Sequence, residues 1–300
     1  MSHVPPLLSR RRLLLGGSAA TAAVLIGACG GDDDRAAPTA GGEETPSARE
    51  GLALVQFVGG PTFVPGPVRV PFGVADADGL LTADASPAEL EVEVLDADGA
   101  PVAPAVTVAR HAEGLPRPYF PLRLDVPAAG FYTARTEIDG IGSELSFQVH
   151  EPGQLQVVGP GDPLPSVVTP TTADAAGVDP ICTSDPVCPL HEVTLADAVT
   201  EGRPVALLVS TPAFCEVAIC GPVLDVLLAV VEQHPDVRFL HAEVYADPYE
   251  DQETYAPIVG DLGLHFEPCL VLAGADGRVV ERLDTIFDVA EASDRLTRLA

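Results

Sequence analysis

The stretch PVALLVSTPAFCEVAICGP, residues 204–222, decides the fold of the C-terminal part of the chain. Its first seven residues, 204–210, are almost all apolar, which is typical of a central strand that is buried on both faces. Apolar residues then recur at helical spacing, at Leu224, Leu227, Leu228 and Val231. We therefore expect a buried strand, a turn that contains Cys215 and Cys220, and an amphipathic helix.

The sequence around this stretch alternates between helix and strand patterns. A short helix is expected over 194–202, a strand over 237–245, two strands joined by a Gly-Ala-Asp-Gly turn over 268–284, and an amphipathic helix over 288–300. The order is strand, helix, strand, hairpin and helix. It predicts an α/β domain with a central mixed sheet.

This order and its cysteines resemble the thioredoxin-like superfamily, over residues 181–300. Cys215 falls at the first active-site position of that family, and Pro222 falls where the family has a proline in the helix. Glu267-Pro268 matches the cis-proline that faces the redox pair. The resemblance implies a three-layer fold and a redox site formed by Cys215, Cys220 and Pro268. It is nearest to extracytoplasmic, membrane-anchored members.

The cysteine spacing departs from that family, because this chain has C-x4-C where thioredoxins have C-x-x-C. Five helical positions separate two side chains by about 140°, so Cys215 and Cys220 do not bridge within a regular helix. Either Cys215 lies in the preceding loop, or the first turn unwinds. A second register also exists, because Cys220-Gly221-Pro222 copies the start of a C-G-P-C motif with Val223 in the last position.

The first residues predict export and lipidation. Ser9 to Leu14 fits a twin-arginine signal, and an apolar stretch of sixteen residues follows from Leu13 to Ala28. This is shorter than the roughly 20 residues of a spanning helix, so residues 1–28 are interpreted as a signal. The stretch ends in a sequence that resembles a lipobox, which predicts a lipid on Cys29 and a location on the extracytoplasmic face of the cell membrane.

Three further segments precede the thioredoxin-like region. Residues 29–50 are rich in Gly, Pro, Ala and acids and predict a flexible tether. Residues 51–152 contain short strand patterns between Pro, Gly and Asp, which predicts an all-β sandwich; Gly130-Phe131-Tyr132 resembles a strand entry of immunoglobulin-like domains. Residues 153–180 are rich in Pro, Gly and Thr and predict a linker.

Charge limits the partners of the protein. The net charge is −28, and all sixteen basic residues, His excepted, are arginines. Such a charge disfavours nucleic acid and anionic membrane surfaces as partners. We expect contact with the membrane through the lipid anchor only, and protein thiols or disulfides as partners. Two Asp-x-Asp-Gly sequences, at residues 76–79 and 96–99, predict hairpin turns and lack the further ligands of a calcium loop.

The remaining cysteines predict a second pair. Cys182 and Cys188 are close in sequence, and an oxidising compartment favours a disulfide between them. Cys269 is then left over, as a buried thiol or as a contact of the Cys215–Cys220 pair. That pair is itself a candidate disulfide, catalytic or structural.

The leading hypothesis is a thiol–disulfide oxidoreductase that needs no cofactor. Cys215 is expected to attack and Cys220 to resolve the mixed disulfide, because Cys215 should be the more exposed and Cys220 should begin to enter the core. The alternatives are a non-enzymatic binding lipoprotein and a thiol peroxidase, although Thr211 is one residue out of place for the latter.

A copper-handling protein that resembles Sco-type chaperones is a further alternative. Those chaperones have C-x3-C, and soft thiolates suit Cu(I). The ligands here would be Cys215, Cys220 and His265. We expect His191, His234 and His241 to be surface or turn residues.

Overall fold

The computed structural model describes residues 51–58, 61–215 and 218–299. The predicted signal over 1–28, the lipidation residue Cys29 and the tether over 29–50 lie outside the described residues. Residues Ala48–Ala300 form one compact unit, made mostly of β-strands with few helices. Within the described ranges, no helix is both long enough and apolar enough to cross a bilayer.

The first half of this unit is all-β, as predicted. One antiparallel sheet contains β1 (Ala53–Gln56), β2 (Gly66–Asp76), β3 (Gly79–Leu80) and β6 (Phe120–Val126). A second contains β5 (Val106–Ala109), β4 (Glu89–Leu95), β7 (Gly130–Ile138) and β8 (Ile141–Val149), in that order. Alternate residues of β7 and β8 are buried, because one face of their sheet packs on the other sheet in a shared apolar core.

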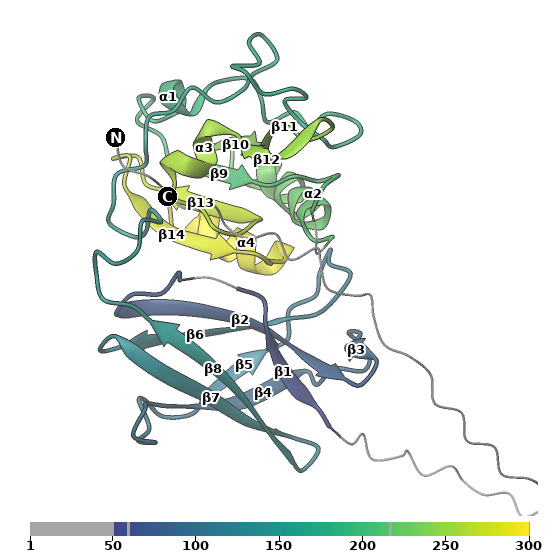
Figure 1. Cartoon of the computed structure of the whole chain (residues 1–300), viewed down its shortest axis with the longest axis vertical. Coiled ribbons are helices and arrows are strands. Elements are labelled where there is room, and N and C mark those ends of the chain that lie inside the picture. Colours follow the sequence, from purple (N-terminus) through teal and green to yellow (C-terminus); the bar gives the residue numbers. More distant parts are fainter. Residues whose placement is uncertain (1–50, 59–60, 216–217, 300) are drawn as a thin grey trace, which may run out of the picture. The chain divides into compact units, whose positions relative to one another are not determined.

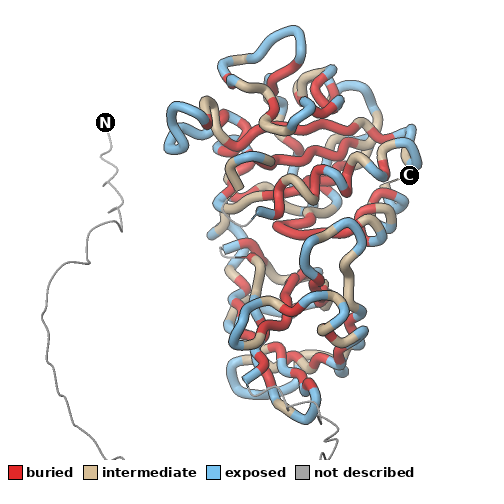
Figure 2. The backbone as a smooth tube through the Cα atoms, turned by 90° about the vertical axis from the view of Figure 1, so that its right-hand side faces the viewer, coloured by how far each residue is buried: buried red, intermediate tan, exposed pale blue. Residues whose placement is uncertain are grey.

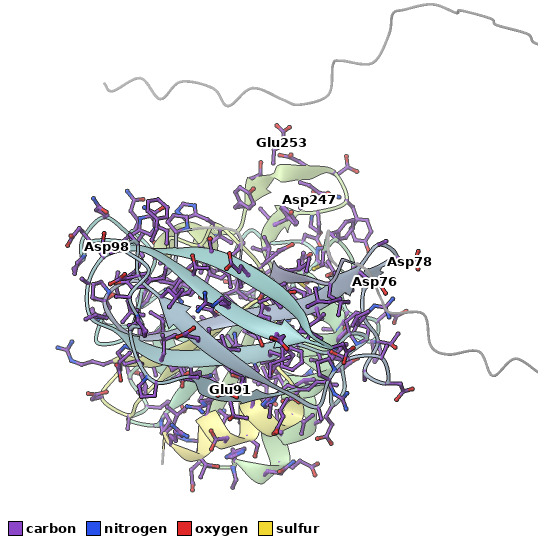
Figure 3. All side chains as sticks on the ribbon, turned by 90° about the horizontal axis from the view of Figure 1, so that it is seen from below. Asp76, Asp78, Glu91, Asp98, Asp247 and Glu253 are labelled. Carbon is purple, nitrogen blue, oxygen red and sulfur yellow. The ribbon has the colours of Figure 1, made fainter. Side chains whose placement is uncertain are left out.

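The two Asp-x-Asp-Gly sequences form turns, as predicted. In each, the first aspartate accepts a hydrogen bond from the backbone two residues later, Asp78 N to Asp76 and Asp98 N to Asp96. The closing glycines have φ of +118° and +79°, which other residues rarely adopt. Figure 3 shows Asp76, Asp78 and Asp98 at the periphery of the molecule, where water solvates their charges.

The second half contains a mixed sheet of four strands in the order β10-β9-β13-β14 (Figure 1). These strands are β9 (Val205–Val209), β10 (Arg238–Ala242), β13 (Cys269–Ala273) and β14 (Val279–Asp284). β9 and β10 are parallel, and β13 is antiparallel to both β9 and β14. Every residue of β9 and of β13 is buried, and Figure 2 shows the chain buried along the strands and exposed in many of the connecting loops.

Helices cover both faces of this sheet. Ala206 and Leu208 of β9 share an apolar cluster with α2 (Cys220–Val230) and α4 (Val289–Thr297). The intervening residues of β9 pack with α1 (Leu195–Ala198) and α3 (Pro257–Asp261). A continuous apolar strand is stable here because each face meets a helix. A 3-10 turn, η1 (Val231–Gln233), ends α2.

Some elements were not predicted from the sequence. These are α3 and the hairpin of β11 (Tyr245–Asp247) and β12 (Asp251–Tyr255). All five residues of β12 are exposed, and Figure 3 shows Glu253 pointing outward from this hairpin. The hairpin has no apolar alternation because neither face of β12 enters a core, so periodicity could not predict it.

The predicted linker packs along the second half of the unit. Its backbone forms hydrogen bonds with three places there: Val158 N to Leu262 O at 2.9 Å, Gly161 N to Val279 O at 2.8 Å, and Leu164 N to Gly277 O at 2.8 Å. Val157 and Leu164 are buried. The segment is therefore a packed part of the unit, although its composition is that of a linker.

A buried ionic network joins the strands of the sandwich to α4. Arg69 on β2 contacts Glu291 on α4, and Arg123 on β6 contacts the same carboxylate at 2.6 Å. The Tyr119 hydroxyl also donates a hydrogen bond to Glu291. Most positions of β2 are buried: Val68, Val70, Phe72 and Val74 pack in the sandwich core, and Arg69 on the other face is buried by this network.

Candidate functional site

The Cys215–Cys220 pair lies between the buried strand β9 and helix α2. Cys215 is half-buried in the connecting loop, and Cys220 is fully buried as the first residue of the helix. Of the two arrangements that C-x4-C allowed, the structure therefore has Cys215 in the preceding loop. The helix N-terminus lies at Cys220, five positions after Cys215. Between them, Ala218 has φ of +53°, a left-handed conformation that is uncommon for alanine.

The two sulfurs and a carboxylate form one cluster. The sulfurs of Cys215 and Cys220 and a carboxylate oxygen of Glu267 all lie within 4.8 Å of one another. The hydrogen bond to Cys215 raises the pKa of the Cys220 thiol, and burial and the negative charge of Glu267 raise it further. The thiol form of Cys220 is therefore favoured over its thiolate. The Glu267-Pro268 bond beside the pair is cis, as predicted.

The copper-binding set proposed from the sequence is not assembled. His265 is exposed, and within the described residues the ligand group around the two cysteines contains Glu267 in place of this histidine. Carboxylate oxygen is a hard ligand, whereas Cu(I) prefers thiolate, thioether and imidazole. The residues of this cluster therefore do not fit a copper(I) centre of the Sco type.

A second cluster contains the other predicted cysteine pair. Cys182 and Cys188 are buried, and their sulfurs lie 3.6 and 3.5 Å from Nδ1 of His241 on β10. Nε2 of His191 lies 3.2 Å from the same Nδ1. All four side chains offer ligand atoms within 4.8 Å of one another. Both cysteines are thiols in this structure, and the disulfide between them stays a prediction.

The expectation that His191 and His241 are surface or turn residues is wrong. Each is only 1% exposed, and their rings contact each other edge to face. His241 belongs to RFLHA, a strand whose last four residues are all buried. Alternation of buried and exposed residues therefore could not indicate that its side chain contacts two cysteines. The one available signal was the spacing Cys-x5-Cys-x2-His over residues 182–191, which brings three metal-ligating side chains into one segment.

Hydrogen bonds orient the ring of His241. Its Nε2 lies 3.2 Å from the carbonyl oxygen of Ser210 and 3.0 Å from the Ser210 hydroxyl. A carbonyl oxygen only accepts hydrogen bonds, so the Nε2 atom carries the proton in the neutral ring. The lone pair of Nδ1 then points to Cys182, Cys188 and His191. This outer contact fixes both the tautomer and the direction of the ring.

The two thiols of this cluster are electrostatically unequal. The hydrogen bond from Cys188, opposed by burial, lowers the pKa of Cys182, and a hydrogen bond from His191 lowers it as well. The same Cys182–Cys188 bond raises the pKa of Cys188, and burial adds to this. One thiolate is therefore stabilised in the cluster, and a second negative charge is opposed by the first.

Cys269 belongs to neither ligand group within the described residues. It is fully buried at the start of β13, and its thiol donates a hydrogen bond to Asp284 at 3.5 Å. Burial raises the pKa of the Cys269 thiol well above its usual value, and the charge of Asp284 adds to this. The residue is thus a buried thiol, which makes it a control for experiments on the other four.

Comparisons with known proteins identify no family. No protein-family model matches the chain, and no curated protein matches it either. Among solved structures, the chain is similar to the solution structure of the PKD domain from human VPS10 domain-containing receptor SorCS2, with 19% sequence identity and a TM-score of 0.22. That match covers 46% of this chain and 99% of the PKD chain.

Proposed function

We propose that this protein is a lipid-anchored, extracytoplasmic thiol–disulfide oxidoreductase with a thioredoxin-like domain, and that Cys215 and Cys220 are its redox pair. One observation carries the proposal: two cysteine sulfurs of unequal exposure adjoin each other where a buried strand leads into a helix. The order β9, α2, β10, β13, β14 and α4 agrees with the thioredoxin-like resemblance.

An immunoglobulin-like sandwich is the corresponding proposal for the first half. It is supported by the hydrogen bond from the Tyr132 hydroxyl to the carbonyl of Ala128, at 2.7 Å. Such a bond, from a tyrosine near the start of a strand to the backbone a few residues upstream, is a tyrosine corner.

The unequal exposure of the two thiols supports a different role for each. Attack on a partner's disulfide needs access and a thiolate; Cys215 is the more accessible sulfur, and at Cys220 the thiol form is favoured. Resolution needs only proximity, which buried Cys220 has. Glu267 is the nearby group that can take the proton from Cys220 when that thiol attacks.

The reaction proceeds in two exchanges. The thiolate of Cys215 forms a bond with one sulfur of the partner's disulfide, and the other sulfur leaves as a thiolate. Cys220 then loses its proton and attacks the sulfur of Cys215. This forms the Cys215–Cys220 disulfide and releases the second partner sulfur. The partner gains two electrons and the pair loses two, and the reverse sequence oxidises a partner dithiol.

An aromatic surface next to Cys215 suits a protein as the partner. The ring of Phe214 contacts the ring of Tyr249 edge to face, with 4.9 Å between their centroids. Tyr249 is 70% exposed, more than is typical of tyrosine, whose burial is ordinarily intermediate. Aromatic residues with one face open to solvent are enriched where proteins bind other proteins.

Trapping experiments test the proposal. Cys220→Ser should accumulate mixed disulfides with partner proteins, because the resolving thiol is missing, whereas Cys215→Ser should not. Cys269→Ser is the matched control, since it removes a buried thiol outside the pair. Trapping by Cys215→Ser alone would reverse the roles and favour the Cys220-Gly221-Pro222 register.

The reduction potential of the pair separates an enzyme from a binding protein. A redox-active pair should have a potential above about −300 mV, the region of labile disulfides, in a glutathione titration of the full chain. A lower potential together with no trapping by either variant would favour the non-enzymatic binding lipoprotein.

A further inference from the structure

The second cluster, formed by Cys182, Cys188, His191 and His241, has the composition of a closed metal site. Its members come from two distant parts of the chain, since His241 lies on β10 and the others precede α1. Each side chain is at most 4% exposed. Two sulfurs and two imidazole nitrogens around one point are the ligand set of structural zinc sites.

The separations between the ligand atoms agree with a tetrahedron around zinc. Bonds of about 2.3 Å to sulfur and about 2.0–2.1 Å to nitrogen, at tetrahedral angles, place sulfur and nitrogen about 3.6 Å apart and two nitrogens about 3.3 Å apart. The observed sulfur–nitrogen distances to His241 are 3.6 and 3.5 Å, and the nitrogen–nitrogen distance is 3.2 Å.

The outer contacts of His241 also match those of a metal ligand. A metal-binding imidazole ordinarily donates its other N–H to a carbonyl, carboxylate or water, which orients the ring. His241 makes this contact with Ser210 O and directs its Nδ1 lone pair to the centre of the cluster. His241 N also donates to the carbonyl of Leu190 at 3.1 Å, so the segment that holds the other ligands is bound to β10 by its backbone.

A disulfide alone would use only half of this cluster. A Cys182–Cys188 bond would join the two sulfurs and leave His191 and His241 with the hydrogen bond between their ring nitrogens, at 3.2 Å. A divalent cation instead takes up all four groups. Its charge balances two thiolates, so the whole unit is neutral and its burial costs little.

We propose that Cys182, Cys188, His191 and His241 bind one Zn²⁺ ion as a structural site separate from the Cys215–Cys220 pair. The four protein ligands complete the tetrahedron and leave no position for a substrate, as in structural rather than catalytic zinc sites. The ion holds residues 182–191 against β10. Because zinc needs thiolates, the site and a Cys182–Cys188 disulfide exclude each other.

Metal analysis of the full chain tests the site. The chain is purified anaerobically with a non-chelating reductant, loaded with zinc and dialysed, and zinc is measured by mass spectrometry. We expect one zinc ion per wild-type chain. The double variant Cys182→Ser/Cys188→Ser should lose it, and the matched variant Cys215→Ser/Cys220→Ser, which removes the other cysteine pair, should retain it.

X-ray absorption at the zinc edge tests the ligands without any variant, so a folding failure of the serine variant does not affect the test. We expect two sulfurs at about 2.3 Å and two nitrogens at about 2.0–2.1 Å in the wild type. Three results would overturn the proposal. The first two are reduced wild-type protein that binds no zinc, and loss of zinc in the Cys215→Ser/Cys220→Ser variant. The third is a Cys182–Cys188 disulfide, found by peptide mapping, in protein isolated from the cells that naturally produce it.

Discussion

The guanidinium of Arg69 lies 2.7 Å from the carboxylate of Glu291, 222 positions later in the chain. Both side chains are nearly inaccessible, with exposed fractions of 6% and 3%. Arg69 also donates to the carbonyl of Asp284 at 3.0 Å. The pair therefore connects a strand of the sandwich to the last helix of the chain, with its charges compensated inside the protein.

Glu291→Gln should destabilise the protein by about 3–5 kcal/mol, because it leaves the buried charge of Arg69 without its anion. The free energy of unfolding is measured by urea denaturation. Glu93→Gln is the matched control, since its pair with Arg135 is largely exposed and should change stability by at most about 1 kcal/mol. Equal losses in the two variants would contradict the prediction.

The effect of Glu291→Gln should disappear in acid. Burial alone would raise the pKa of Glu291, but the charge and hydrogen bonds of Arg69, with Arg123 and Tyr119, hold that pKa at about 2, below its usual value of 4.5. A depressed folded-state pKa stabilises the protein above the unfolded value, and this contribution is lost as pH falls from about 4.5 to about 2. Urea denaturation of both proteins at each pH checks this; a constant difference would refute it.

Tyr249→Ala should impair reactions with protein disulfides more than those with small disulfides. The exposed ring lies against Phe214, next to Cys215, and offers contact area that only a large partner uses. We expect a higher KM for a protein disulfide and an unchanged rate with a small aromatic disulfide. Tyr255→Ala on the same hairpin, whose ring stacks on Tyr245, is the control. An equal loss with both substrates would indicate damage to the redox pair instead.

Gly263→Ala should destabilise the protein more than Gly202→Ala. Both glycines have positive φ, of +64° and +68°, which costs other residues roughly 1–2 kcal/mol. Only at residue 263 would the added Cβ meet backbone, because it would lie 2.4 Å from the carbonyl oxygen of Gln156, whereas at residue 202 it would meet open space. Thermal denaturation of the two variants compares them; similar losses would mean that Gln156 moves away without cost.

Cys29→Ala should release the protein from the membrane or block its processing, because the sequence Ile26-Gly27-Ala28-Cys29 resembles a lipobox. The measurement is membrane fractionation with an immunoblot of the full chain. Replacing Ser47 with Ala, in the predicted tether, should leave fractionation unchanged. A Cys29→Ala protein that is still processed and still sediments with membranes would disprove the anchor.

The sequence by itself determined most of the elements. Short alternating or apolar runs between Pro, Gly and Asp predicted the all-β first half; in β7 and β8 the alternation arises because one face enters a core and the other meets water. The apolar run that becomes β9 predicted a strand with two covered faces, and the pattern after Cys220 predicted α2. The relative exposure of Cys215 and Cys220 also agrees with expectation, because distance from the strand end and proximity to the apolar stripe are local properties.

Only the tertiary structure decided which side chains meet. His241 and His191 are 50 positions apart, and His241 lies in a strand whose neighbouring residues are equally buried, so no periodicity distinguishes a ligand from a core residue. The same holds for Arg69 and Glu291, and for Glu267, which replaces the expected His265 beside the cysteine pair. Periodicity reports which face of an element is buried. The partner on that face is selected by chain packing, which brings distant residues within hydrogen-bonding distance.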